Sequence, residues 1–151
     1  MAKIKKIKKQ DLGQLIAIWK EVFSLHNVFN KTDEEILKYL KKTKGKILAA
    51  YEDSKVVGGC LLVVNAQTPE HSLARIKHVA VAKDFQGKDI GSVLLKKCEK
   101  IVKKGKIEIH VAEHEKNTLE FYGKNGYEQE GVLKSHYRPD EACYVLGKVI
   151  L

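Results

Sequence analysis

Apolar and polar positions follow two different periods along the chain, and the changes of period divide it into elements. The opening stretch AKIKKIKK alternates as a strand does. Helical spacing follows from Asp11, the expected cap, to Leu25, and Thr32 with Glu35 forms a capping box that opens a second helix. We therefore expect one strand and two helices in the first third of the chain.

The pattern then becomes that of strands. KILAAYE and KVVGGCLLVVN are two apolar runs joined at Asp53 and Ser54, which indicates a hairpin. Further strands are expected over residues 73–81, 106–112, 127–133 and 142–150, with helices beginning within QGKDIGSVLL and over 115–124. This order predicts the α/β (α+β) class, with a mixed central sheet between helices. No linker or repeat interrupts the pattern, so we expect a single domain over residues 1–151.

Two of these segments have a definite inner face. In the strand KIEIHVA, Glu108 and His110 share one face, and the isoleucines and the valine occupy the other. In the helix that begins in QGKDIGSVLL, the expected buried stripe comprises Val93, Leu94, Cys98, Ile101 and Val102.

The composition narrows the class of protein. Hydrophobic residues make up 44% of the chain and charged residues 31%, as in ordinary globular proteins. No apolar stretch approaches the roughly 20 residues that span a bilayer, and the basic N-terminus lacks the apolar core of a signal peptide. We expect a cytoplasmic protein without a membrane partner. Cys60, Cys98 and Cys143 have neither zinc nor disulfide spacing, so we expect buried, inert thiols.

The net charge of +9 is compatible with a nucleic acid, an anionic cofactor or an acidic substrate. Almost all of the cations are lysines, and Arg75 and Arg138 are the only arginines. Specific contacts with bases and bidentate hydrogen bonds to phosphates favour arginine over lysine. The lysines are also spread along the chain. This distribution favours a solvated surface over a specific nucleic-acid site.

The stretch QGKDIGSVLL follows a strand and opens a helix. The first N–H groups of a helix have no internal partner, and the helix dipole favours an anion beside them. Glycine lets a ligand approach the backbone closely, although a tight turn between strand and helix also uses glycine for steric reasons. Asp89 lies within the loop, where a carboxylate would repel a phosphate. An anion site and a simple turn both remain open on this evidence.

Two motifs carry a family resemblance. HVAVAKDFQGKDIGSVLL resembles the acetyl-CoA motif of the GNAT N-acetyltransferases, Gln/Arg-x-x-Gly-x-Gly/Ala, with Gln86, Asp89 and Gly91 at its three positions. LEFYGKNGYE resembles the family's second signature, an aromatic-Tyr pair followed by Gly-aromatic. The resemblance implies the GNAT fold, in which about seven strands form a mixed sheet with a parallel splayed pair, flanked by about four helices.

The resemblance also implies acetyl-CoA as the co-substrate, with no metal. The residues carried over to its binding are Val79, Ala80 and Val81 beside the pantetheine, and Gln86, Gly87, Lys88, Asp89, Ile90, Gly91 and Ser92 around the pyrophosphate.

Two side chains match catalytic positions of the family. Tyr122 matches the tyrosine that protonates the departing thiolate, and packing as a core aromatic is the alternative. His110 lies twelve residues before Tyr122, the offset at which some Nα-acetyltransferases place a base. An imidazole suits base chemistry at neutral pH, although a strand histidine can also be purely structural.

The sequence departs from the family pattern at Asp89, where a glycine is usual, and at Glu115, where an asparagine is usual. Two acids near an anionic ligand would weaken acetyl-CoA binding. Because the loop binds through backbone N–H groups, we expect the Asp89 side chain to face solvent, near Lys83 or Lys88.

The C-terminal stretch KSHYRPDEACYVLGK resembles the tyrosine-rich segment of Nα-acetyltransferases, including those that acetylate ribosomal proteins. There Tyr137 matches a tyrosine that contacts the acceptor, and His78 either lines the amine pocket or packs in the sheet. The expected acceptor is a peptide or protein N-terminus. A small amine (polyamine, amino sugar or amino acid) and a non-catalytic acyl-CoA-binding regulatory module remain alternatives, and we expect a monomer or homodimer.

Overall fold

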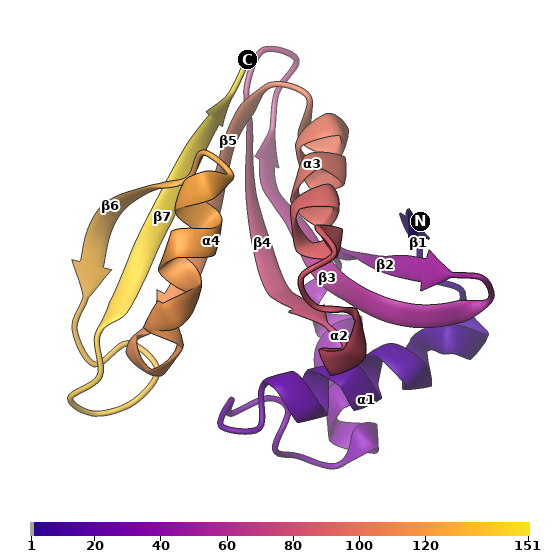
Figure 1. The fold of residues 1–151 in the computed structure, drawn as a ribbon. Coiled ribbons are helices and arrows are strands. Elements are labelled where there is room, and N and C mark those ends of the chain that lie inside the picture. The colour runs from indigo at the N-terminus through magenta and orange to yellow at the C-terminus, as the bar shows by residue number, and fades with distance from the viewer. Residues whose placement is uncertain (1) are drawn as a thin grey trace. The chain divides into compact units, whose positions relative to one another are not determined.

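The computed structural model describes residues 2–151. Its strands form a mixed seven-stranded sheet in the order β1-β2-β3-β4-β5-β7-β6 (Figure 1), which confirms the predicted fold class. The chain forms two compact units. The first takes the chain up to Val63 together with His78–Cys98, and the second takes Val64–Lys77 together with Glu99–Leu151. In the described residues no helix is long and apolar enough to cross a membrane.

The first unit begins with three antiparallel strands. The elements in the N-terminal half of the chain are β1 (Lys3–Lys6), α1 (Leu12–Val22), α2 (Asp33–Thr43), β2 (Lys46–Glu52) and β3 (Lys55–Gln67). β1 pairs with β2, and β2 pairs with β3 through a tight hairpin in which Glu52 lies opposite Lys55. Asp53 adopts a left-handed φ of 57° in the turn, a conformation that aspartate tolerates better than most residues. The predicted hairpin is confirmed.

The core of the first unit forms between α1 and the strands. α1 buries the face that carries Leu15, Ile16 and Trp19, and Phe29 and Ile36 from the following segments join the same cluster. Each such side chain contributes about 1.5–3 kcal/mol when it is removed from water. The capping box is present as predicted, with the Thr32 hydroxyl accepting the Glu35 N–H at 3.2 Å.

The second unit contains the C-terminal strands. Its elements are β5 (Gly105–Ala112), α4 (Leu119–Lys124), β6 (Glu128–Leu133) and β7 (Cys143–Ile150). β7 pairs antiparallel with both β5 and β6. Along β5 the isoleucines and the valine are buried, whereas Glu108 and His110 are half-buried, so the predicted alternation is confirmed.

A short parallel pairing joins β5 to β4 (Ser72–Val81). It connects Ser72–Arg75 to Gly105–Glu108, while β4 continues to Val81 and β5 to Ala112. The expected parallel pair is therefore present over part of the length of each strand. Gly105 has a φ of 140°, and a Cβ there would overlap the carbonyl oxygen of Ser72, so only glycine fits the start of this pairing.

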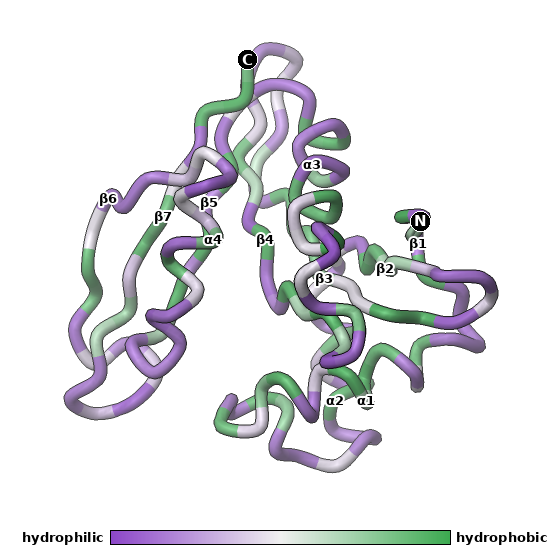
Figure 2. Tube along the Cα trace, in the orientation of Figure 1, coloured by the Kyte–Doolittle hydropathy of each residue, from purple (hydrophilic) through white to green (hydrophobic). Residues whose placement is uncertain are grey.

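Two expectations about helix faces and caps are wrong. Asp11 stands at the N-cap position of α1 but makes no capping bond, because its carboxylate instead accepts the Tyr51 hydroxyl at 2.8 Å. Val93 is 39% exposed, and Leu95 is buried in its place within α3 (Ile90–Val102). The apolar run VLL offers helical spacing two ways, and only tertiary packing decides between them. Figure 2 shows hydrophobic and hydrophilic residues alternating along α3.

The predicted helix over residues 115–124 is divided. A 3-10 helix covers Glu113–Thr118 and contains a kink at Glu115, whose φ is −110°, and α4 follows over six residues. The three cysteines are buried as expected, and the sulfurs of Cys60 and Cys98 lie 3.7 Å apart.

Candidate active site

The loop that opens α3 lies in the first unit and has two left-handed residues. β4 is followed by a 3-10 turn over Lys83–Phe85, and α3 begins at Ile90. Between them, Gly87 has a φ of 80° and Asp89 a φ of 62°. The first N–H groups of any helix lack internal partners, and the left-handed residues of this loop leave its backbone open to a ligand, which favours an anion.

Asp89 occupies the left-handed position that the family usually fills with glycine. Aspartate and asparagine visit this region more readily than other residues with a side chain, which gives the substitution a conformational reason. The side chain is exposed, as predicted, and the backbone carbonyl accepts the Val93 N–H at 3.0 Å. Among residues 2–151 no ion pair joins Asp89 to Lys83 or Lys88. The Lys88 ammonium lies instead over the Phe85 ring, 5.0 Å from its centroid.

Gln86 holds the loop against the end of β4. Its side-chain amide donates a hydrogen bond of 3.0 Å to the carbonyl oxygen of Val81. The next residue, Ala82, donates its N–H to the Val57 carbonyl on β3 at 2.8 Å, and Ala80 is buried. The glutamine of the motif thus has a structural function here, since it fixes where the loop leaves the strand.

His78 lies within β4 and has a left-handed φ of 58°. Its carbonyl oxygen accepts the Trp19 indole N–H at 2.7 Å, and its Nε2 lies 2.9 Å from the Tyr39 hydroxyl. The ring packs edge-on against Phe29 and His26, with centroids 4.8 and 5.2 Å away. These contacts fix both the ring and the irregular backbone that leads to Val79.

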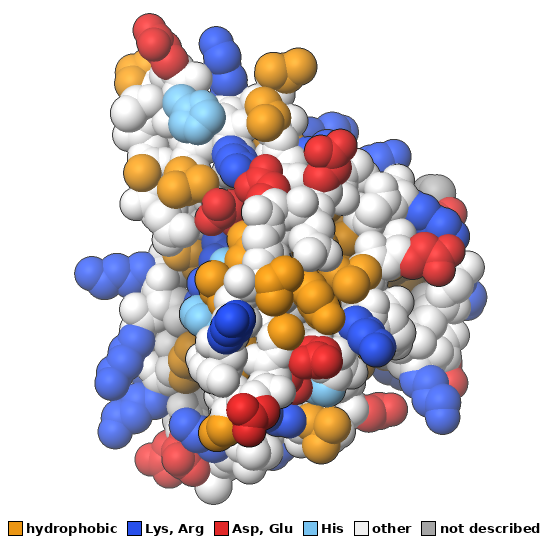
Figure 3. Space-filling model, turned by 90° about the vertical axis from the view of Figure 1, so that its left-hand side faces the viewer, with side chains coloured by type: hydrophobic (Ala, Val, Ile, Leu, Met, Phe, Trp, Pro, Cys, Tyr) orange, Lys and Arg blue, Asp and Glu red, His pale blue; other side chains and the backbone are white. Residues whose placement is uncertain are grey.

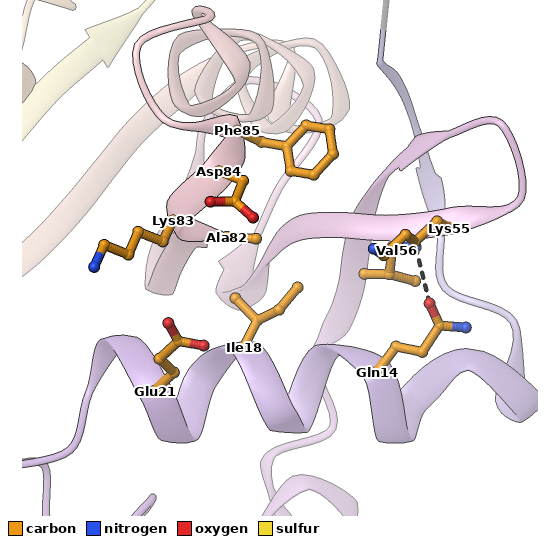
Figure 4. Close-up of a pocket in the computed structure, with 9 residues that line it drawn as sticks. All are labelled: Gln14, Ile18, Glu21, Lys55, Val56, Ala82, Lys83, Asp84 and Phe85. Atoms are coloured by element: carbon orange, nitrogen blue, oxygen red, sulfur yellow. Dashed lines mark hydrogen bonds between the residues drawn. The ribbon is translucent and has the colours of Figure 1, made fainter.

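A groove of about 410 Å³ lies between α1 and the turn that follows β4 (Figure 4). Within it the Val56 N–H donates to the Gln14 side-chain oxygen at 3.0 Å. Two lysines and two carboxylates border the groove, so it favours no ligand of a particular charge. The lining residues are Gln14, Ile18, Glu21, Lys55, Val56, Ala82, Lys83, Asp84 and Phe85.

The second unit contains a cluster of polar side chains around Arg75 of β4. Its Nη2 lies 2.8 Å from Nδ1 of His110 and 2.8 Å from the Tyr137 hydroxyl. A guanidinium can only donate, so Nδ1 accepts and the neutral imidazole carries its proton on Nε2. The His136 ring lies 5.6 Å from that of His110 and 4.5 Å from that of Tyr137. The sequence gives no signal for these contacts, because Arg75 and Tyr137 are far apart in the chain.

The cluster is electropositive. Burial lowers the pKa of His110 to about 4, and the nearby charges of Arg75 and Lys77 act in the same direction. Burial, followed by Arg75, also lowers the pKa of Lys77. The Tyr137 pKa is raised mainly by burial. The imidazole of His110 is therefore neutral at pH 7, the form that can accept a proton.

Tyr122 and Glu115 both lie in the second unit. Tyr122 is 8% exposed on α4, and its ring is 5.1 Å from that of Phe121 and 6.4 Å from that of Tyr127. Burial raises the pKa of Glu115, which lies 3.7 Å from His114.

The surplus positive charge forms no single patch on the face drawn in Figure 3. Lysine and arginine side chains are distributed around this face with acidic side chains between them. This distribution agrees with the solvated surface expected from the sequence.

Comparisons with known proteins agree with the fold. The model of the acetyltransferase (GNAT) domain matches residues 43–129, which include the loop, His110 and Tyr122 but not Tyr137. An uncharacterized N-acetyltransferase of Methanocaldococcus jannaschii is 26% identical over 150 aligned positions, covering 89% of this chain. The aligned part is 64% of that relative's length, so the chain spans less than two thirds of the relative.

Solved structures share the whole fold at low sequence identity. Ard1 from Thermoplasma volcanium has a TM-score of 0.82 at 18% identity, covering 99% of this chain and 98% of its own. An aminoglycoside 6'-N-acetyltransferase complexed with coenzyme A has a TM-score of 0.79 at 16% identity, covering 99% and 97%. Arabidopsis thaliana Naa50, in complex with the bisubstrate analogue CoA-Ac-MVNAL, has a TM-score of 0.76 at 20% identity, covering 97% of each chain. From the family match over more than half of its length, the chain belongs to the GNAT acetyltransferase family.

Proposed function

We propose that this protein is an acetyl-CoA-dependent N-acetyltransferase that acts on a primary amine. The observation that carries the proposal is the loop Gln86–Ser92, which combines the family's acetyl-CoA motif with a left-handed backbone before α3. Such a loop suits a phosphate ligand, because backbone N–H groups and a helix N-terminus supply the positive end of a dipole. The solved structure of the aminoglycoside enzyme with coenzyme A supports the same co-substrate.

In this proposal the co-substrate is held mainly by backbone groups. The N–H groups from Gln86 to Ser92 would bind the pyrophosphate, and the backbone of Val79 to Val81 would pair with the pantetheine amides. The carbonyl of Val81 already accepts the Gln86 amide, but a carbonyl oxygen has a second lone pair for another donor. A donor near Val79 would stabilise the oxyanion of the tetrahedral intermediate.

The chemistry requires three proton transfers. A charged amine loses one proton before it attacks and a second after the carbon–nitrogen bond forms, and the departing thiolate gains one; the second amine proton can restore the hydroxyl of the acid that protonates the thiolate. The amine nitrogen attacks the thioester carbonyl, the carbon–sulfur bond breaks, and the departing thiolate takes a proton. Tyr122 is proposed as the acid that donates this proton. The amine must lose a proton as well, since an α-amine has a pKa of about 8 and is mostly charged at pH 7. His110 is proposed as its base, through Nδ1, because Nε2 already carries a proton in the neutral ring.

We further propose that the acceptor is the N-terminus of a peptide or protein, contacted by Tyr137. The bisubstrate complex of Naa50, which joins coenzyme A to a peptide, supports this acceptor class. The aminoglycoside enzyme favours the second candidate, a small amine on the same fold. We do not include His78 in the proposed acceptor site. Its carbonyl oxygen contacts Trp19 and its ring contacts Tyr39.

Calorimetry with acetyl-CoA, followed by a thiol-release assay over a panel of peptides and small amines, tests the proposal. We expect saturable acetyl-CoA binding and thiol release with peptides. Release with a polyamine or amino sugar alone would support the second candidate. Binding without release for any amine would support a non-catalytic acyl-CoA-binding module, and no binding at high micromolar acetyl-CoA would contradict the proposed function.

The pH dependence of turnover tests His110 separately. His110→Ala should lower turnover and change the acidic limb of the pH–rate profile, since the base is removed. An unchanged acidic limb would exclude His110 as the base while leaving the acetyltransferase assignment intact.

A further inference from the structure

Arg75 has no counter-ion in the described part of the chain. Its side chain is half-buried, and its hydrogen bonds go to the His110 ring and the Tyr137 hydroxyl, both neutral. Glu108 lies opposite Arg75 in the parallel register, but no ion pair joins the two among residues 2–151. A partly buried guanidinium is usually paired with a carboxylate or phosphate.

The hydrogen bonds of this guanidinium are also incomplete. Nε of Arg75 is the one buried side-chain nitrogen or oxygen that lacks a hydrogen-bond partner in residues 2–151. A buried donor without a partner is costly, and in a native protein such a group calls for an explanation. The guanidinium would regain both charge balance and a hydrogen-bond acceptor if an anion bound beside it.

The groups around Arg75 leave this charge uncompensated. Burial and then the charge of Arg75 lower the pKa of Lys77, and His136 faces His110 from the segment before β7. The carboxylate of Glu115, in the 3-10 helix, raises the pKa of Tyr137, but its effect is the smallest of those on that pKa. The surroundings of the guanidinium therefore favour a negative ligand.

We propose that Arg75 binds a carboxylate carried by the amine acceptor, so that the preferred acceptor is a peptide N-terminus with an acidic side chain in its first residues. This inference rests on the proposed function, because it places the acceptor beside His110 and Tyr137. Arg75 contacts both of these side chains, and a planar guanidinium matches a carboxylate through two parallel hydrogen bonds.

Binding of the carboxylate also changes the state of His110. The hydrogen bond from Arg75 occupies Nδ1, the ring nitrogen that would accept the amine's proton. When the guanidinium turns towards the carboxylate, Nδ1 becomes free to accept that proton. An acidic acceptor would therefore be favoured in two ways. It pairs with Arg75, and it frees Nδ1 of His110 to act as the base.

The test compares peptides that differ only in one charge. Calorimetry in the presence of coenzyme A measures binding of short peptides with Asp or Glu in the first or second position, and of the same peptides with Asn or Gln. We expect the acidic peptides to bind the wild-type protein about tenfold more tightly, the size of one charge-assisted hydrogen bond. Free aspartate is a further arm, and tighter binding of aspartate than of the peptides would assign the carboxylate to an amino-acid acceptor.

Variants assign the preference to Arg75. Arg75→Gln should abolish it, Arg75→Lys should retain part of it, and Lys134→Gln, which removes an exposed cation in the same unit, should leave it unchanged. Binding of an acidic peptide should also raise the pKa of His110, and proton NMR of the His110 ring measures this pKa. If Arg75 had a merely structural role, the pKa would not rise. Equal binding of acidic and amide peptides by the wild-type protein would overturn the proposal, as would a full preference in a folded Arg75→Gln variant.

Acetyl transfer is measured separately on the same peptides. If the binding preference holds but no peptide is acetylated, the proposed function fails and the carboxylate site stands. If both peptides of a pair are acetylated with equal kcat/KM and bind equally, the function stands and the carboxylate site fails.

Discussion

The loop Gln86–Ser92 and the cluster around Arg75, the two ligand sites that we propose, would bind their ligands by different means. The loop presents backbone N–H groups whose direction depends on φ at Gly87 and Asp89. The cluster presents side chains, and its geometry depends on contacts between β4, β5 and the segment before β7. A backbone site tolerates an unusual side chain that adopts the required φ, whereas a side-chain site changes with every substitution. We therefore expect substitutions at Asp89 to have smaller effects than substitutions at Arg75.

The largest effect is expected where one side chain supplies a proton. Tyr122→Phe should lower kcat by about 100-fold or more, the usual contribution of a general acid, with the acetyl-CoA Kd nearly unchanged. Steady-state kinetics and calorimetry measure the two quantities. Tyr127→Phe is the matched control, since its hydroxyl donates to Glu99 and its ring neighbours that of Tyr122. Wild-type turnover in Tyr122→Phe would show that the tyrosine only packs in the core.

A backbone change in the loop should have the next largest effect. In Gly87→Ala the added Cβ meets no other atom, but a φ of 80° costs about 1–2 kcal/mol. The free loop should relax to relieve this strain, and acetyl-CoA, which must restore the conformation, should bind about tenfold more weakly. Calorimetry measures the Kd. Gly13→Ala in α1 is the control, because it has equal space and no positive φ, and it should stabilise the helix. Unchanged affinity in Gly87→Ala would mean that the loop does not bind through its backbone.

The side-chain cluster should make stability depend on pH. The folded pKa of His110, about 4, lies below its ordinary 6.5, mainly through burial and then through Arg75. The unfolded chain therefore binds more protons between these values, and stability falls as the pH is lowered from about 6.5 to about 4. Thermal melts across this range should fall less steeply for His110→Gln than for the wild type. His71→Gln, an exposed histidine of the same unit, should follow the wild type, and identical slopes for all three proteins would contradict a neutral, half-buried His110.

The smallest effect is expected at Asp89. Asp89→Gly preserves the left-handed φ of 62° and removes a negative charge, so acetyl-CoA affinity should stay the same or rise by about twofold. Asp89→Val forces a β-branched residue into this conformation and should weaken binding. A marked loss of affinity in Asp89→Gly would show that the carboxylate has a direct role.

Much of the fold could be predicted because its signals are local. The capping box at Thr32, the hairpin at Asp53 and the alternation along β5 each depend on residues close together in the chain. The errors arise where a distant partner decides. Tyr51 takes the Asp11 carboxylate away from the helix it was expected to cap, and packing selects Leu95 over Val93.

The candidate site also has one part that could be predicted from the sequence and one part that could not. The loop motif is contiguous, so its position before α3 could be read from the sequence, although the left-handed φ of Asp89 could not. The contacts of Arg75 with His110 and Tyr137 join residues 35 and 62 positions apart, and no periodic pattern reports such contacts. The family resemblance identified His110 and Tyr137 as candidates, but the sequence did not show that the Arg75 side chain contacts both.

The central claim is acetyl transfer to a peptide N-terminus. The most direct measurement is the intact mass of a lysine-free peptide with an acidic first residue, incubated with acetyl-CoA and the protein. We expect a mass increase of one acetyl group that requires both acetyl-CoA and the protein and is reduced in Tyr122→Phe. An unmodified peptide, with a folded protein that binds acetyl-CoA, would contradict it.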